Sequence, residues 1–102
     1  MNYISNKKIK LPIVHPYNES AWHLFVIRTK NRDKLISYLE SHDIGYGIHY
    51  PIPPHKQLCY DYLNYKLSLT ERVSDEILSL PIFPYMTDNE VSYVIDVINK
   101  YR

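Results

Sequence analysis

The segment Trp22-His23-Leu24-Phe25-Val26-Ile27-Arg28 carries the strongest strand signal in the chain. It is rich in aromatic and β-branched residues, which favour extended backbone. Its apolar run is nearly continuous and is too short for an ordinary helix. Runs of this kind are typical of strands that are covered on both faces or that lie centrally in a sheet. We therefore predict a strand over Trp22–Arg28, around which the other elements are arranged.

A helix is predicted directly after this strand. Asn31 is suited to its N-cap, and Asp33 places a negative charge in its first turn, where the helix dipole favours one. The apolar stripe that this helix turns inward consists of Leu35, Ile36 and Leu39. The strand and this helix together form the first half of the expected domain.

The second half begins with a short strand over Gly47–Tyr50, which the following prolines end. Helices are then predicted over Lys56–Leu63 and Thr70–Ser79. Leu80–Pro84 is bounded by prolines, so it fits only an edge strand. Thr87-Asp88-Asn89-Glu90 is a capping box, and the helix behind it is amphipathic. Its apolar stripe is Val91, Val94, Ile95 and Ile98.

The expected order is β-α-β-α-α-β-α, which predicts a two-layer α+β domain with a small sheet covered by helices. The first twenty residues are polar and punctuated by Pro12 and Pro16. We therefore interpret residues 1–20 as an extended lead-in and residues 21–102 as the domain. Three lysines of the lead-in lie close together, and we favour a solvated face over a phosphate site for them. They are Lys7, Lys8 and Lys10.

Composition excludes several classes of function. A chain of 102 residues is one small domain, and its net charge of +1 lacks the cationic excess of nucleic-acid-binding proteins. Its two glycines are too few for the usual nucleotide-binding loops. The single cysteine, Cys59, excludes an internal disulfide and fits a reducing compartment. No apolar run approaches the ~18 residues that cross a bilayer, so we expect a cytoplasmic protein without a membrane partner.

The most informative stretch for function is Gly45–His55, which carries two imidazoles and two phenols around a proline-rich turn. Binding groups are often found on loops that a rigid scaffold holds. The alternative is that these residues only pack against the helices, with His49 hydrogen-bonded in place. A metal site is not expected, because His49, His55 and Cys59, even with His23 nearby, lack the tight ligand pairs of zinc sites. Cys59 is more typical of a small core residue than of a nucleophile.

Three pieces of this sequence stand in a characteristic order: WHLFVIR from Trp22, GIHYPIPPHKQ from Gly47, and LSLPIFPYMTDNEVSYVI from Leu78. With Leu11–Pro12 they extend over almost the whole chain. In this the chain resembles the C-terminal small domain of the DegT/DnrJ/StrS family of pyridoxal-phosphate-dependent sugar aminotransferases. The resemblance implies a small, largely antiparallel sheet covered by helices, like the C-terminal small domain of fold-type-I aminotransferases.

The resemblance also implies a function. Family members transfer an amino group, usually from glutamate, to a nucleotide-linked keto sugar, and two subunits build each site. We expect a homo-oligomer, such as a dimer, and a role in surface-polysaccharide biosynthesis, lipopolysaccharide included. In the family, pyridoxal phosphate is held by a lysine of the large domain, and its ring serves as an electron sink.

None of the lysines here lies in the sequence context of that cofactor lysine. The resemblance therefore implies that this chain has no catalytic residue, binds no pyridoxal phosphate and is inactive alone. It places the HYP segment near the cleft, which makes His49 and Tyr50 candidates for binding the substrate and His55 a weaker one. An alternative is a stand-alone module that binds a sugar nucleotide, or associates with itself, without catalysis.

Overall fold

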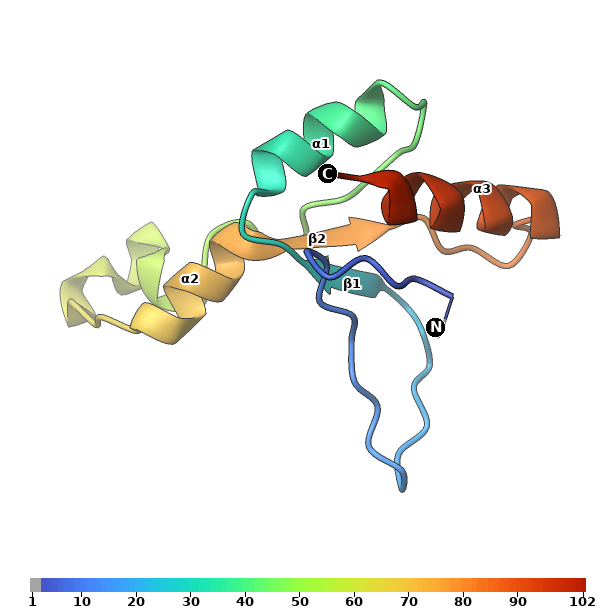
Figure 1. Cartoon of the computed structure of the whole chain (residues 1–102). Coiled ribbons are helices and arrows are strands. Elements are labelled where there is room, and N and C mark those ends of the chain that lie inside the picture. The colour runs from blue at the N-terminus through green and yellow to red at the C-terminus, as the bar shows by residue number, and fades with distance from the viewer. Residues whose placement is uncertain (1–2) are drawn as a thin grey trace.

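The computed structural model describes residues 3–102 and contains one small sheet with helices around it (Figure 1). In chain order the elements are β1 (Phe25–Arg28), α1 (Arg32–Glu40), the 3₁₀ helices η1 (Pro54–Lys56) and η2 (Leu58–Leu63), α2 (Ser68–Glu76), β2 (Ile77–Leu80) and α3 (Asp88–Lys100). Within the described part of the chain no helix is long and apolar enough to cross a membrane.

The sheet consists of β1 and β2, which pair antiparallel with Phe25 opposite Leu80 and Arg28 opposite Ile77. A single bridge extends it on each side. Lys10 pairs with Arg28 of β1, and Gly47 pairs with Ser79 of β2. The predicted α+β class with a small antiparallel sheet is therefore confirmed.

Two strand predictions were wrong in their bounds. The first strand begins at Phe25 instead of Trp22, because Trp22 has a φ of 47° and leaves the extended region. The edge strand expected over Leu80–Pro84 is instead Ile77–Leu80. The helix expected over Thr70–Ser79 ends at Glu76, because pairing with β1 buries the residues that follow and outweighs their helical spacing.

Three local predictions also need correction. The segment Gly47–Tyr50 makes only the bridge at Gly47, and Tyr50 turns away with a φ of 53°. The helix expected over Lys56–Leu63 is instead divided between η1 and η2, which are both 3₁₀. Asn31 stands at the N-cap of α1, but its side chain makes no capping hydrogen bond.

The core lies between the sheet and helices α1 and α3. Its largest fully buried side chains are Ile27, Leu35, Leu39, Leu78 and Ile98. A hydrogen bond from the Tyr38 hydroxyl to the Val97 carbonyl, 3.1 Å long, joins the two helices directly. Both helices therefore bury apolar residues against the same strands. In the stripe predicted for α3, Ile98 is buried but Val91 is 39% exposed, and the buried Val97 is not part of that prediction.

The predicted capping box at the start of α3 is confirmed. The Glu90 backbone N–H donates to Thr87 Oγ1 at 3.3 Å, and the Thr87 backbone N–H donates to Glu90 Oε2 at 2.8 Å. The Thr87 hydroxyl also donates to Glu90 Oε2 at 2.9 Å. The hydrogen bond from the Thr87 backbone N–H, followed by that from its hydroxyl, lowers the pKa of Glu90. The box fixes where α3 begins and so which of its faces meets the sheet.

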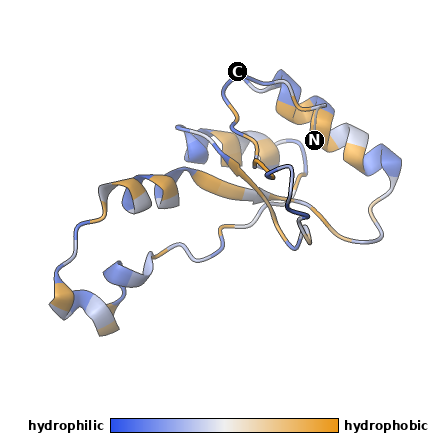
Figure 2. Cartoon of the chain, turned by 90° about the horizontal axis from the view of Figure 1, so that it is seen from below, coloured by the Kyte–Doolittle hydropathy of each residue, from blue (hydrophilic) through white to orange (hydrophobic). Residues whose placement is uncertain are grey.

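Two extended arms leave this core, residues 11–24 (the N-terminal arm) and residues 50–67 (the middle arm) (Figures 1 and 2). The radius of gyration, 15.4 Å, exceeds the about 13 Å of a compact chain of this length. The accessible surface, 8079 Å², exceeds the about 6,000 Å² of a compact monomer of this mass. Large hydrophobic side chains stand exposed on both arms, among them Ile13, Tyr17, Leu58 and Tyr62.

Candidate functional site

An open hollow of about 350 Å³ lies beside the sheet, where the bridge at Gly47 meets β2. Two imidazoles line it. His49 follows the bridge directly, and His23 precedes β1. The end of β2 contributes Ser79 and Leu80 to the lining. The sheet therefore brings together residues that lie far apart in the sequence.

His49 is held against β2 by backbone and side-chain contacts. The Gly47 N–H donates to the Ser79 carbonyl at 3.0 Å, and the Ser79 N–H donates to the Gly47 carbonyl at 2.8 Å. Two residues further on, Nδ1 of His49 lies 3.0 Å from Oγ of Ser79. One interpretation from the sequence is that His49 is only hydrogen-bonded in place. This is true of Nδ1, but the same ring also lines the hollow.

Tyr50 and His55 do not line this hollow. Tyr50 is 85% exposed, and its positive φ directs the chain away into the middle arm. The His55 side chain is 6% exposed, and its Nε2 donates to Glu71 Oε1 at 3.0 Å. The structure thus separates the three substrate-binding candidates and leaves His49 alone at the hollow. Their assignment to a substrate stays a prediction.

Glu71 is a junction between the middle arm and α2. Besides His55, its carboxylate accepts a hydrogen bond from the Leu67 backbone N–H at 3.2 Å and lies 3.5 Å from Nζ of Lys56. The hydrogen bond from His55, followed by that from Leu67, lowers the pKa of Glu71. His55 therefore anchors the base of the middle arm.

Sequence reasoning missed Ser79 as a site residue, because it expected a helix there. The one signal was its place in the LSLP piece. Cys59, expected in the core, is exposed on η2. No group of three metal-ligating side chains gathers among residues 3–102, and the series from His49 to Cys59 does not converge.

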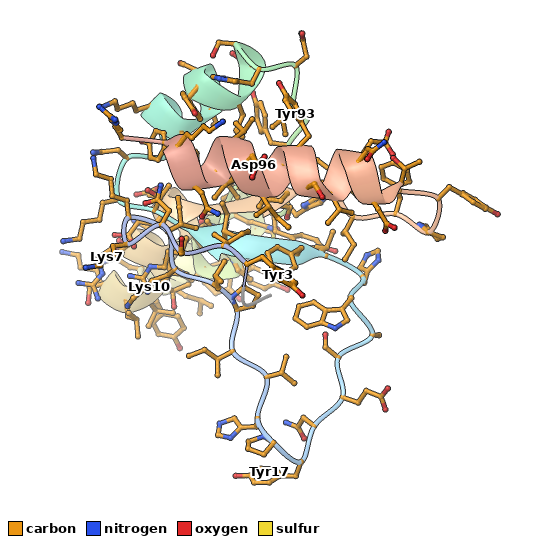
Figure 3. The ribbon with its side chains drawn as sticks, turned by 45° about the vertical axis from the view of Figure 1, so that its right-hand side comes forward. Tyr3, Lys7, Lys10, Tyr17, Tyr93 and Asp96 are labelled. Atoms are coloured by element: carbon orange, nitrogen blue, oxygen red, sulfur yellow. The ribbon has the colours of Figure 1, made fainter. Side chains whose placement is uncertain are left out.

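A second hollow, of about 470 Å³, is lined by basic side chains. The cations are Lys7, Lys8, Lys10, Arg28, Lys30 and Arg72. Glu76 is the acidic residue of this lining, and it forms an ion pair with Arg28. Lys7 and Lys10 point to the same side of the molecule (Figure 3). The three lysines of the lead-in are thus joined by cations from β1 and α2.

The lining of the His49 hollow lacks the group that an aldehyde cofactor needs. Such a cofactor forms a Schiff base with a lysine amine. The lining contains histidine, serine, tyrosine and apolar residues but no lysine. The residues of this hollow therefore do not fit pyridoxal phosphate on their own.

Comparison with known proteins places these features in a family. The model of the DegT/DnrJ/EryC1/StrS aminotransferase family matches residues 4–99. The chain is 40% identical over 102 residues to the dTDP-3-amino-3,6-dideoxy-alpha-D-galactopyranose transaminase of Aneurinibacillus thermoaerophilus, covering 99% of this chain and 28% of that enzyme. It is 34% identical over 96 residues to the dTDP-3-amino-3,4,6-trideoxy-alpha-D-glucose transaminase of Streptomyces venezuelae, covering 91% of this chain and 25% of that enzyme. The chain spans about a quarter of the length of these relatives.

Solved structures agree with this result. The Streptomyces venezuelae protein DesV, crystallised in complex with a ketimine intermediate, superposes with a TM-score of 0.88 at 32% identity, over 98% of this chain and 28% of that one. NtdA from Bacillus subtilis, crystallised with bound cofactor PMP, superposes with a TM-score of 0.75 at 27% identity, over 90% of this chain and 22% of that one. On the match over residues 4–99, the chain belongs to the DegT/DnrJ/EryC1/StrS aminotransferase family.

Proposed function

We propose that this chain is the C-terminal small domain of a sugar-nucleotide aminotransferase and forms one wall of its substrate site. The observation that carries the proposal is the alignment of 99% of the chain, at 40% identity, with a transaminase named for a dTDP-linked amino sugar. The reaction moves an amino group, with glutamate as donor, to a keto-deoxysugar on a nucleotide, for surface-polysaccharide synthesis. The enzyme works in the cytoplasm.

In this proposal His49 contacts the sugar nucleotide from the hollow beside β2, and Tyr50 and His55 are further substrate-binding candidates on the middle arm, outside that hollow. Support comes from the hollow beside β2, in which the His49 ring is held at Nδ1 and retains Nε2 for a ligand. Imidazole N–H groups bind sugar hydroxyl and phosphate oxygens well at neutral pH. The Schiff-base lysine and the rest of the cofactor site belong to polypeptide outside these residues, so the chain by itself does not transaminate.

Two experiments test this function. Sequencing the DNA upstream of the Met1 codon is the first, and an uninterrupted frame that encodes a lysine-bearing large domain is expected. The second is a chimera in which this chain replaces the matching quarter of the Aneurinibacillus thermoaerophilus enzyme. We expect the chimera to aminate the parent's dTDP-keto sugar, and His49→Ala to reduce its kcat/KM. A chimera that carries the cofactor but does not turn over contradicts the proposal, as does full activity of the His49→Ala variant.

A second candidate function is self-association without catalysis. The observation that favours it is the accessible surface of 8079 Å² and the exposed hydrophobic side chains of the two arms. Apolar patches of this kind mark surfaces that other protein covers. A stand-alone module of this kind binds a sugar nucleotide without the large domain. Calorimetric titration of the chain with a dTDP-sugar distinguishes it from a domain that needs its large partner.

A further inference from the structure

We propose that Ser79 and Gly47 are positioning residues that hold the His49 imidazole in one tautomer, with Nε2–H offered as a hydrogen-bond donor to an oxygen of the ligand. This inference rests on the proposed function only in naming a ligand for His49. The arrangement of the ring itself follows from the contacts in this chain.

The first step concerns the hydrogen bonds of Ser79. This residue is 5% exposed, and its backbone N–H and carbonyl are both hydrogen-bonded to Gly47. Among residues 3–102 the Ser79 hydroxyl has one hydrogen-bond partner, Nδ1 of His49 at 3.0 Å. We expect this buried hydroxyl to donate its hydrogen bond to Nδ1 of His49, because a buried donor without an acceptor costs free energy.

The second step is the position of the protons. If Nδ1 carried the proton, it would donate to Ser79 Oγ, and the hydroxyl proton of Ser79 would then have no acceptor among residues 3–102. If the Ser79 hydroxyl donates to an unprotonated Nδ1, both atoms of this contact are satisfied. The neutral ring then carries its proton on Nε2. We assign this tautomer from the hydrogen-bond accounting.

The third step is the room that Gly47 leaves for the ring. A Cβ at position 47 would lie 2.5 Å from Cε1, 3.1 Å from Nδ1 and 3.3 Å from Nε2 of His49. The first of these distances is well inside van der Waals contact, so any side chain at Gly47 displaces the imidazole. Gly47 has no positive φ, and its role is therefore space and not backbone freedom.

The consequence is that the His49 ring offers the ligand a hydrogen-bond donor and not an acceptor. With Nδ1 used by Ser79, Nε2 is the ring atom left for a ligand in the hollow, and in the neutral ring it donates. An acceptor oxygen, such as that of a phosphate, carbonyl or hydroxyl group, satisfies this donor. A ligand that offers only a donor leaves it unpaired and is rejected.

The test is long-range ¹H–¹⁵N NMR of the labelled chain at a pH where the imidazole is neutral. For the wild type we expect His49 as a fixed Nε2–H tautomer with a hydrogen-bonded Nδ1. Ser79→Ala shifts the Nδ1 resonance to that of a free acceptor, and Ser79→Thr, which keeps the hydroxyl, restores it. Gly47→Ala displaces the ring and removes its contact with Ser79. Ser37→Ala, which deletes a hydroxyl on the exposed side of α1, is the matched control and leaves His49 unchanged.

A His49 ring protonated at Nδ1, or one whose Nδ1 resonance ignores Ser79→Ala, overturns the proposal. Amide spectra of each variant establish that it is folded. In the chimera, Ser79→Ala is expected to raise KM about two- to tenfold with kcat nearly unchanged, because one substrate contact loses its orientation. The NMR result needs no substrate, so an inactive chimera refutes the proposed function without affecting this inference, and the reverse also holds.

Discussion

At the scale of single residues, His49 and His55 lie in one segment of the sequence but have different hydrogen-bond partners and different roles. The two imidazoles lie six residues apart on the same proline-rich stretch. His49 bonds to β2 through Ser79, and His55 bonds to α2 through Glu71. One ring therefore lines a hollow, while the other fixes the base of the middle arm. Residue type alone does not distinguish the two roles.

The Glu71 contacts predict a pH dependence of stability. Folding lowers the pKa of Glu71, so its carboxylate stabilises the fold at pH values above the ordinary pKa of glutamate. This contribution is lost as the pH falls through the pKa of Glu71 in the folded chain. Glu71→Gln is expected to be less stable than the wild type at pH 7 and equal to it in acid. Urea denaturation over a pH series measures the difference. Glu19→Gln, on the exposed N-terminal arm, is the control, and a Glu71→Gln difference that stays constant with pH contradicts the prediction.

At the scale of elements, the helices with complete local signals lie where they were predicted. The α3 helix has both halves of its capping box, so its start at Asp88 follows from nearby residues. The β2 strand has no such local signal. Its residues carry helical spacing, and the partner strand that makes them extended is about fifty residues away in the sequence.

The capping box predicts that removing the Thr87 side chain lowers the stability of the fold. Thr87→Ala removes the acceptor for the Glu90 N–H, and we expect the free energy of unfolding to fall by about 1 kcal/mol. Ser92→Ala, on the exposed side of the same helix, is the control, because alanine favours a helix interior. Urea denaturation of both variants provides the comparison. Equal stability of the two would show that the box contributes nothing.

The packing of α1 predicts a larger loss of stability when a buried leucine of this helix is truncated. Leu39 is fully buried between α1 and the sheet, so Leu39→Ala is expected to lower the free energy of unfolding by about 2–5 kcal/mol through lost burial and a residual cavity. Leu69→Ala makes the same chemical change on α2, where the side chain is 60% exposed, and should cost far less. Thermal and urea unfolding measure both. A similar cost at the two positions contradicts the placement of the core.

At the scale of the whole molecule, the two arms decide how the chain meets other protein. They hold exposed hydrophobic residues far from the core, and Tyr17 stands at the end of one of them (Figure 3). A chain with about a third more surface than a compact monomer of its mass has groups that its own fold does not cover. In the proposed function that surface is covered by the large domain and by a second subunit.

For the chain alone, this surface predicts concentration-dependent self-association. We expect sedimentation velocity to show a dimer or larger species at high concentration. Leu58→Asp, at a side chain that is 93% exposed on η2, should weaken the association at least tenfold without unfolding the chain. Ser92→Asp, which adds the same charge on α3, serves as the control. A clean monomer of the wild-type chain at high concentration contradicts the prediction.

The sequence by itself determined the fold class, the presence of helices α1 and α3, and the motifs that identify the family. These features depend on local spacing and on residues that are close together in the chain. Only the tertiary structure decided where β2 lies, that Ser79 meets His49, and that His55 turns to Glu71 instead. The physical reason is that strand pairing and side-chain hydrogen bonds join residues that lie 16 (His55 and Glu71) to 55 (Phe25 and Leu80) positions apart, and their gain in burial outweighs local preference.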